Sequence, residues 1–145
     1  MEFYIEQLKT FSPDVTQVVN DLLIQLNPTS KILSDKDIKE IVEGQSNQLF
    51  VARRKNDKKI VGMLTLVIYR IPVWRKGWLE DIVVDKEYRN KGIATQLIKH
   101  AIEAAKDDGV LSLNFTSNPN REAANSLYQR LGFEKRNTNV YWIKL

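Results

Sequence analysis

The chain of 145 residues is the size of one domain and is long enough to bury a core of its own. It carries 22 Lys and Arg residues against 18 Asp and Glu residues, a formal net charge of +4, and it contains no cysteine and one histidine. These counts exclude disulfides, thiolate metal sites, a cysteine nucleophile and a metal site built from histidines, so no metal is expected. No apolar run approaches the roughly 20 residues of a membrane span, and no signal-peptide pattern opens the sequence. We therefore expect a single domain over 1–145, soluble and cytoplasmic, with no membrane partner.

The first half of the chain predicts a strand, two amphipathic helices and two further strands. The expected bounds are 3–8, 12–27, 34–44, 48–53 and 59–71. Ser12 and Ser34 stand where the two helices begin, with Pro13 in the first turn of the longer one. Gly62 lies inside the long apolar strand and predicts a β-bulge. The basic run 53–59 between the last two strands reads as a solvated hairpin loop, and a nucleic-acid patch is the less favoured interpretation.

The second half continues with strands and helices in alternation. A strand, a helix, a strand, a helix and two closing strands are expected over 78–84, 93–109, 111–115, 120–131, 133–135 and 140–144. Residues 137–139 form the turn between the closing strands. The whole order predicts an α/β (α+β) fold, with a mixed, mostly antiparallel sheet of six to seven strands and about four helices.

One short basic turn carries the strongest functional signal. The apolar strand ends at Val84, the turn 88–92 follows, and an amphipathic helix begins at once. The first N–H groups of a helix lack intrahelical partners and the helix dipole is positive there, so a phosphate or pyrophosphate fits this place. Gly92 lets such a ligand approach the backbone, and Arg89 and Lys91 add positive charge. An ordinary solvated connection between strand and helix is the alternative.

Two motifs at this point resemble the GCN5-related N-acetyltransferase (GNAT) superfamily. Arg89-x-x-Gly92-x-Ala94 resembles its pyrophosphate loop, and Leu127–Tyr128 followed by 131–133 resembles its Leu-Tyr-x-x-x-Gly-Phe signature. The resemblance is specific over 78–133 and weak over 1–75. It implies the GNAT fold, in which the fourth and fifth strands splay apart around acetyl-CoA. It also implies an N-acetyltransferase that moves an acetyl group directly to a primary amine in a ternary complex.

Catalysis of this transfer needs a base for the amine, a donor to the developing oxyanion and an acid for the thiolate. Glu80 is the predicted base, with Asp81 as alternative, because two consecutive acids inside so apolar a strand are unexpected unless one of them faces water. Strand alternation places Trp78, Glu80, Ile82 and Val84 on one face and Leu79, Asp81 and Val83 on the other. Pairing of the acids with Lys or Arg across the sheet is the structural alternative.

The resemblance supplies the remaining roles. The backbone N–H of Val83 or Val84 is the expected oxyanion donor, and Tyr128 is the expected acid, its alternative being a plain core aromatic. Asn125, one turn before Tyr128, is expected to bind the coenzyme. The residues expected to bind the cofactor are Ile82, Val83, Val84, Arg89, Asn90, Lys91, Gly92, Ile93, Ala94, Thr95, Asn125 and Tyr128.

The acceptor is the least determined part of the prediction. Glu80-Asp81-Ile82 resembles the glucosamine-phosphate N-acetyltransferases, which favours an amino sugar phosphate or another small amine. Tyr69, Trp74, Trp78 and Tyr141 offer aromatic surface near the segments that select the acceptor, although packing in the core or at the sheet edge is the favoured interpretation for each of them singly. A protein or peptide amine, a CoA-binding module without catalysis and a nucleic-acid-binding protein stay open as alternatives, and a homodimer is possible.

Overall fold

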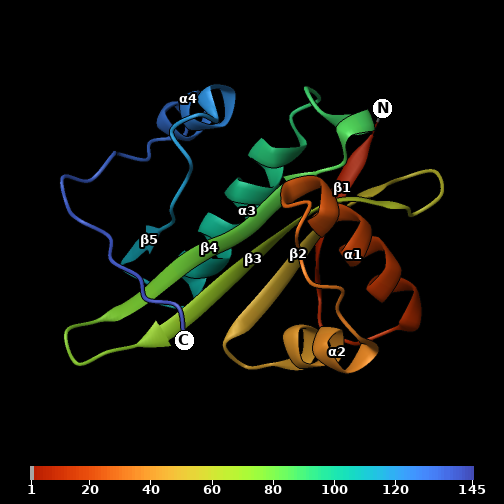
Figure 1. Cartoon of the computed structure of the whole chain (residues 1–145), viewed down its shortest axis with the longest axis horizontal. Helices are drawn as coiled ribbons and strands as arrows, with labels where there is room; N and C mark the ends of the chain where they lie inside the picture. The colour runs from red at the N-terminus through yellow and green to blue at the C-terminus, as the bar shows by residue number, and fades with distance from the viewer. Residues whose placement is uncertain (1) are drawn as a thin grey trace. The chain divides into compact units, whose positions relative to one another are not determined.

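The computed structural model describes residues 2–145 (Figure 1). The chain divides into two compact units, residues 1–115 and residues 116–145. The first unit contains every strand of the described chain and three α-helices, whereas the second contains one α-helix and extended chain. The expectation of a single domain over 1–145 stays a prediction.

The first unit is built on one five-stranded sheet in the order β1-β2-β3-β4-β5. Its strands are β1 (Phe3–Leu8), β2 (Asn47–Arg54), β3 (Ile60–Arg70), β4 (Arg75–Val84) and β5 (Ser112–Asn114). Neighbouring strands from β1 to β4 are antiparallel, and β5 is parallel to β4. Its helices are α1 (Pro13–Leu26), α2 (Asp35–Glu43), the short 3₁₀ helix η1 (Lys86–Tyr88) and α3 (Ile93–Asp107).

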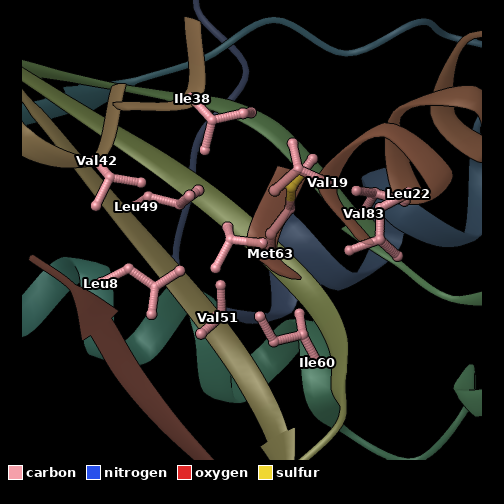
Figure 2. Packing of buried hydrophobic residues seen from close by; sticks show 11 residues of the cluster. Leu8, Val19, Leu22, Ile38, Val42, Leu49, Val51, Ile60, Met63 and Val83 are labelled. Atoms are coloured by element: carbon pink, nitrogen blue, oxygen red, sulfur yellow. The ribbon is translucent and has the colours of Figure 1, made fainter. Parts of the chain in front are cut away.

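The two faces of the sheet bury different helices. On one face Leu49, Val51 and Met63 pack with side chains of α1 and α2 (Figure 2). On the other face the Cα of Gly62 lies close to α3, since a Cβ there would meet Ile93 and Leu97 at 3.3 and 3.4 Å. Successive residues of a strand point to opposite faces. Gly62 faces α3 and its neighbour Met63 faces α1 and α2, so α3 covers the opposite face of the sheet from α1 and α2.

Local sequence explains how the helices begin. Ser34 caps α2 in a full capping box with Asp37, in which each side chain accepts from the backbone N–H of the other residue. Pro13 occupies the first turn of α1 as predicted. Ser12 stands at the N-cap of α1, but its side chain makes no cap hydrogen bond.

The second unit contains α4 (Glu122–Arg130), which ends in a Schellman motif. Gly132 has φ +96°, the Phe133 N–H donates to the Tyr128 carbonyl at 3.1 Å, and the Gly132 N–H donates to the Gln129 carbonyl at 3.1 Å. The spacing Leu-Tyr-x-x-x-Gly-Phe therefore has a local physical reason. The glycine ends the helix in the left-handed conformation, and the next residue closes the cap.

The predicted fold class is confirmed, but the strand count differs. Among residues 2–145 the sheet has five strands instead of six to seven, because the closing strands expected over 133–135 and 140–144 do not form. Residues 140–143 alternate β-branched and aromatic side chains, which is typical of a strand, but a strand also needs a partner. In the structure these four side chains are between 67% and 86% exposed.

No helix in the described part of the chain is long and apolar enough to cross a bilayer.

Candidate functional site

A β-bulge interrupts β4 at the two predicted acids. Met63 of β3 pairs with Val83, but Thr65 pairs with Glu80, so two steps on β3 correspond to three on β4. Asp81 takes φ +50°, a left-handed conformation that Asp tolerates better than most residues. A β-bulge was also predicted at Gly62. The structure has a register shift next to that glycine: Ala52 pairs with Gly62 and Arg53 pairs with Ile60, so Val61 is the extra residue.

The bulge makes the predicted alternation wrong beyond Glu80. Met63 and Thr65 lie on the same face of β3, so their partners Val83 and Glu80 also share a face. Val83 belongs to the core that α1 and α2 cover. The extra residue thus brings Val83, and not Ile82, to the side of Glu80, because one inserted residue inverts the phase of every later side chain.

Within residues 2–145, β4 has no partner strand on its β5 side beyond Trp78. The parallel pairing joins Lys76–Trp78 only to Ser112–Asn114, whereas β4 continues to Val84. The splay that the family resemblance implied is therefore present in the strand pairing. No strand of the described chain pairs with this stretch of β4 on that side, and the Val84 carbonyl accepts from Arg89 Nε at 3.0 Å.

The turn after β4 has the geometry of an anion-binding nest. Asn90 and Gly92 both take left-handed conformations, with φ +62° and +79°. No side chain caps the start of α3 within the described residues, so the first-turn N–H groups of residues 93–95 are left for a ligand. A Cβ on Gly92 would meet nothing within 4 Å among those residues, so the backbone angle, and not crowding, requires the glycine.

The two carboxylates at the bulge are unusual electrostatically. Desolvation by burial raises the pKa of Glu80, and the neighbouring Asp81 charge raises it further; desolvation also raises the pKa of Asp81. Neither side chain forms a salt bridge or hydrogen bond within residues 2–145. The structural alternative, pairing with a cation across the sheet, therefore has no support in the contacts.

Aromatic side chains share the face of Glu80. Val67 pairs with Trp78, and Tyr69 pairs with Lys76. Every second residue of a strand shares a face, so these side chains lie on the same face of the sheet as Thr65 and Glu80. Trp78 Nε1 donates to Tyr69 Oη at 2.9 Å. Both rings are half-buried, so α1 and α2 leave this end of the face partly open.

In the second unit, Tyr128 and Asn125 lie on α4. Tyr128 is buried, and desolvation raises the pKa of its hydroxyl, while the charge and hydrogen bond of Arg121 act in the opposite direction. Asn125 Nδ2 donates to the Asn118 carbonyl at 3.0 Å, so this amide fixes the turn that precedes α4.

The basic run of the β2–β3 hairpin is largely paired with acids. Salt bridges join Arg53 to Glu6, Arg54 to Asp57 and Lys55 to Glu2. This internal pairing favours the interpretation as a hairpin loop over that of a nucleic-acid patch.

Sequence reasoning missed the bulge and the burial of Tyr88. The signal for the bulge was the pair of adjacent acids in an apolar strand. In a regular strand adjacent side chains point to opposite faces, so one of the two acids would point into the core. Tyr88 stood beside the predicted phosphate loop, but nothing local showed that its ring is buried against distant side chains.

Comparison with known proteins agrees with this geometry. A family model described as Acetyltransferase (GNAT) family matches residues 15–133. N-acetyltransferase 8 of Homo sapiens is 28% identical over 95 residues, which are 63% of this chain and 42% of that protein. N-alpha-acetyltransferase 30 of Schizosaccharomyces pombe is 36% identical over 58 residues, which are 40% of this chain and 39% of that protein. The chain thus spans about 40% of the length of these curated relatives.

Among solved structures, an aminoglycoside N-acetyltransferase in complex with CoA superposes with a TM-score of 0.81. The superposition covers 99% of this chain and 95% of that one, at 21% identity. At this identity the likeness shows a shared fold and no more.

Proposed function

Because the chain belongs to the acetyltransferase (GNAT) family, we propose that it moves an acetyl group from acetyl-CoA to a primary amine of a small molecule by direct transfer. One observation carries this proposal. Within the described residues, the bulged strand β4 has no partner on one side beyond Trp78, and it leads through the short helix η1 to the left-handed turn that opens α3. A thioester beside the strand and a diphosphate at the turn would fit that order of features.

The donor would be held mainly by the backbone. The N–H groups of Ile93, Ala94 and Thr95 face an anion at the start of α3, where the helix dipole adds to their attraction. Arg89, Asn90, Lys91 and Gly92 form the turn itself. The pantetheine arm would lie along the free edge of β4 at 82–84, by analogy with an added strand.

The chemistry needs three groups from this chain. The amine nitrogen attacks the thioester carbonyl carbon and loses a proton to Glu80, directly or through a water. A backbone N–H of Val83 or Val84 stabilises the oxyanion, the C–S bond breaks, and Tyr128 donates a proton to the thiolate. The products are the N-acetylated amine and CoA, and the cycle closes when Glu80 releases its proton to solvent and Tyr128 regains one from solvent. A raised pKa suits both side chains, since it makes Glu80 a stronger base and keeps Tyr128 protonated.

A small amine is the favoured acceptor. The open part of the Glu80 face offers one carboxylate next to the hydrogen-bonded rings of Trp78 and Tyr69, which suits a cationic amine on an apolar or sugar-like body. A peptide amine is the second candidate, and the 36% identity to an N-alpha-acetyltransferase over 58 residues favours it.

Release of the CoA thiol tests the proposal. The purified chain is given acetyl-CoA and a panel comprising glucosamine 6-phosphate, an aminoglycoside, simple alkylamines and peptides with free N-termini. Amine-dependent thiol release with at least one small amine is the expected result. Release with peptides alone would replace the favoured acceptor by the second one. Tight CoA binding with no release for any amine would indicate a CoA-binding module instead of an enzyme.

A further inference from the structure

Tyr88 is a buried residue beside the turn 89–92, and its ring contacts several other side chains. It ends η1 immediately before Arg89, and it is only 8% exposed. The Phe3 ring meets it edge-on, with centroids 6.4 Å apart at 85°. The Arg54 guanidinium and the Lys59 ammonium lie 5.3 and 5.6 Å from its ring centroid. Two segments that are distant in sequence, β1 and the β2–β3 hairpin, therefore converge on this one side chain.

The hydroxyl of Tyr88 adds a directional contact. Arg54 Nη1 donates to Tyr88 Oη at 2.8 Å, and Arg54 Nε donates to Asp57 Oδ1 at 3.0 Å. Asp57 thus orients the guanidinium that binds the phenol. Through Arg54, the β2–β3 hairpin is tied to the last residue before the turn.

Hydrogen bonds also hold the first residues of the connection from β4 to α3. The Asp85 N–H donates to the Val61 carbonyl at 2.8 Å, and the Lys86 N–H donates to Gln25 Oε1 of α1 at 2.8 Å. Arg89 reaches back to the Val84 carbonyl. The residues beyond these anchors, 90–92, contain the left-handed conformations of the nest.

We propose that Tyr88, held by Arg54, is a positioning residue for the diphosphate of the acetyl donor. This inference rests on the proposed function. Positive φ is only one of the conformations open to Asn90 and Gly92, so without anchors the turn would populate others and would have to be ordered when the ligand binds. The contacts of Tyr88 order the turn before the donor arrives, and preorganisation of this kind improves affinity without any contact to the ligand.

The test compares two donors that differ in the diphosphate. Tyr88→Leu removes the ring contacts and the hydroxyl, and Tyr88→Phe removes only the hydroxyl. For acetyl-CoA we expect Tyr88→Leu to raise KM about tenfold and Tyr88→Phe about threefold, with kcat within about twofold of wild type. For acetyl-pantetheine, which has no diphosphate, both variants should have the KM of the wild-type chain.

Two further variants, at Tyr4 of β1 and at Arg54 of β2, complete the test. Tyr4 has Lys58 at 5.1 Å from its ring centroid but does not adjoin the turn, so Tyr4→Leu should leave both KM values unchanged. Arg54→Leu removes the same hydrogen bond and also the contact of the guanidinium with the ring, so it should raise KM for acetyl-CoA at least as much as Tyr88→Phe. The double variant should be less impaired than the product of the two single effects, because both single changes remove the same hydrogen bond.

Equal KM increases for both donors, or a fall in kcat with KM unchanged, would overturn the inference, because general loss of packing would act that way. If Tyr88→Leu does not fold by circular dichroism, Tyr88→Phe and Arg54→Leu decide the question. Calorimetry with CoA separates the two proposals. No binding to the wild-type chain refutes the proposed function, whereas equal binding to wild type and Tyr88→Phe refutes only the positioning role.

Discussion

At the scale of single residues, Glu80 owes its properties to an irregularity of its own strand. Without the bulge, Glu80 and Asp81 would alternate strictly, and one of them would point into an apolar layer. The left-handed Asp81 leaves both side chains exposed, while their surroundings still penalise the charged forms. A carboxylate that is partly desolvated and lacks a cationic partner is suited to accept a proton.

Glu80→Gln tests this role through pH. In the wild-type chain kcat/KM should fall as the pH drops through the raised pKa of Glu80, because the protonated acid cannot act as a base. In the variant this acid limb should disappear and kcat should fall about a hundredfold at neutral pH. Asp81→Asn is the control. If it lost the acid limb and Glu80→Gln kept it, Asp81 would be the base.

The same variant should be the more stable protein at neutral pH. A carboxyl pKa that is higher in the folded chain than in the unfolded chain contributes stability below the unfolded value and loses it as the pH rises. Glu80→Gln should therefore melt above wild type near pH 7, and the difference should shrink below about pH 4. Thermal melts at the two pH values measure it, and a lower melting temperature near pH 7 would show that the carboxylate is stabilised in the fold.

Tyr128→Phe tests the proposed acid. The ring is buried, so the variant should keep the fold and the affinity for CoA but lower kcat about a hundredfold. Since the pKa of the phenol is raised, the wild-type chain should keep this activity to at least about pH 10. A kcat equal to wild type at every pH would remove the acid role and leave Tyr128 as a core aromatic.

At the scale of elements, the two glycines at the ends of α3 allow the effect of backbone strain to be distinguished from the effect on ligand binding. Gly92 at the start of α3 and Gly109 just beyond its end have nearly the same φ, +79° and +76°. A Cβ at either one would meet nothing within 4 Å in the described chain. The two positions are thus matched in backbone strain, and only one of them lies in the proposed diphosphate site.

This pair makes a controlled experiment. Gly92→Glu and Gly109→Glu should each destabilise the fold by about 1–2 kcal/mol, because a Cβ is strained in the left-handed conformation. Only Gly92→Glu should abolish CoA binding, since its carboxylate would occupy and repel the diphosphate site. Denaturant melts and calorimetry measure the two effects. Normal CoA affinity in folded Gly92→Glu would disprove the assignment of the turn.

At the scale of the whole molecule, the donor should act as a stabilising ligand. A ligand at a hundred times its Kd adds about 2.7 kcal/mol to the free energy of unfolding if it binds only the folded chain. For a chain of this size that corresponds to a rise in Tm of roughly 5–10 °C. Pantetheine without the diphosphate should give a much smaller shift, because the nest and the helix dipole act on the anion. Equal shifts for CoA and pantetheine would contradict diphosphate binding at the turn.

Much of this protein could be predicted from short stretches of sequence. The helix start at Ser34 and the helix end at Gly132 depend on interactions within a few residues, so local spacing is sufficient to predict them. The turn around Gly92 was predicted for the same reason, since an unpaired helix start and a residue that tolerates positive φ are both local properties.

What required the tertiary structure was every feature that depends on a distant partner. The expected strand over 140–144 failed because favourable side chains do not supply a neighbouring strand. The bulge at Asp81 became visible only in the register between β3 and β4, and it decided which side chains share a face with Glu80. The role proposed for Tyr88 depends on its contacts with Phe3 and Arg54, which are distant in sequence. Pairing register and long-range packing are properties of two segments together, and neither segment contains them alone.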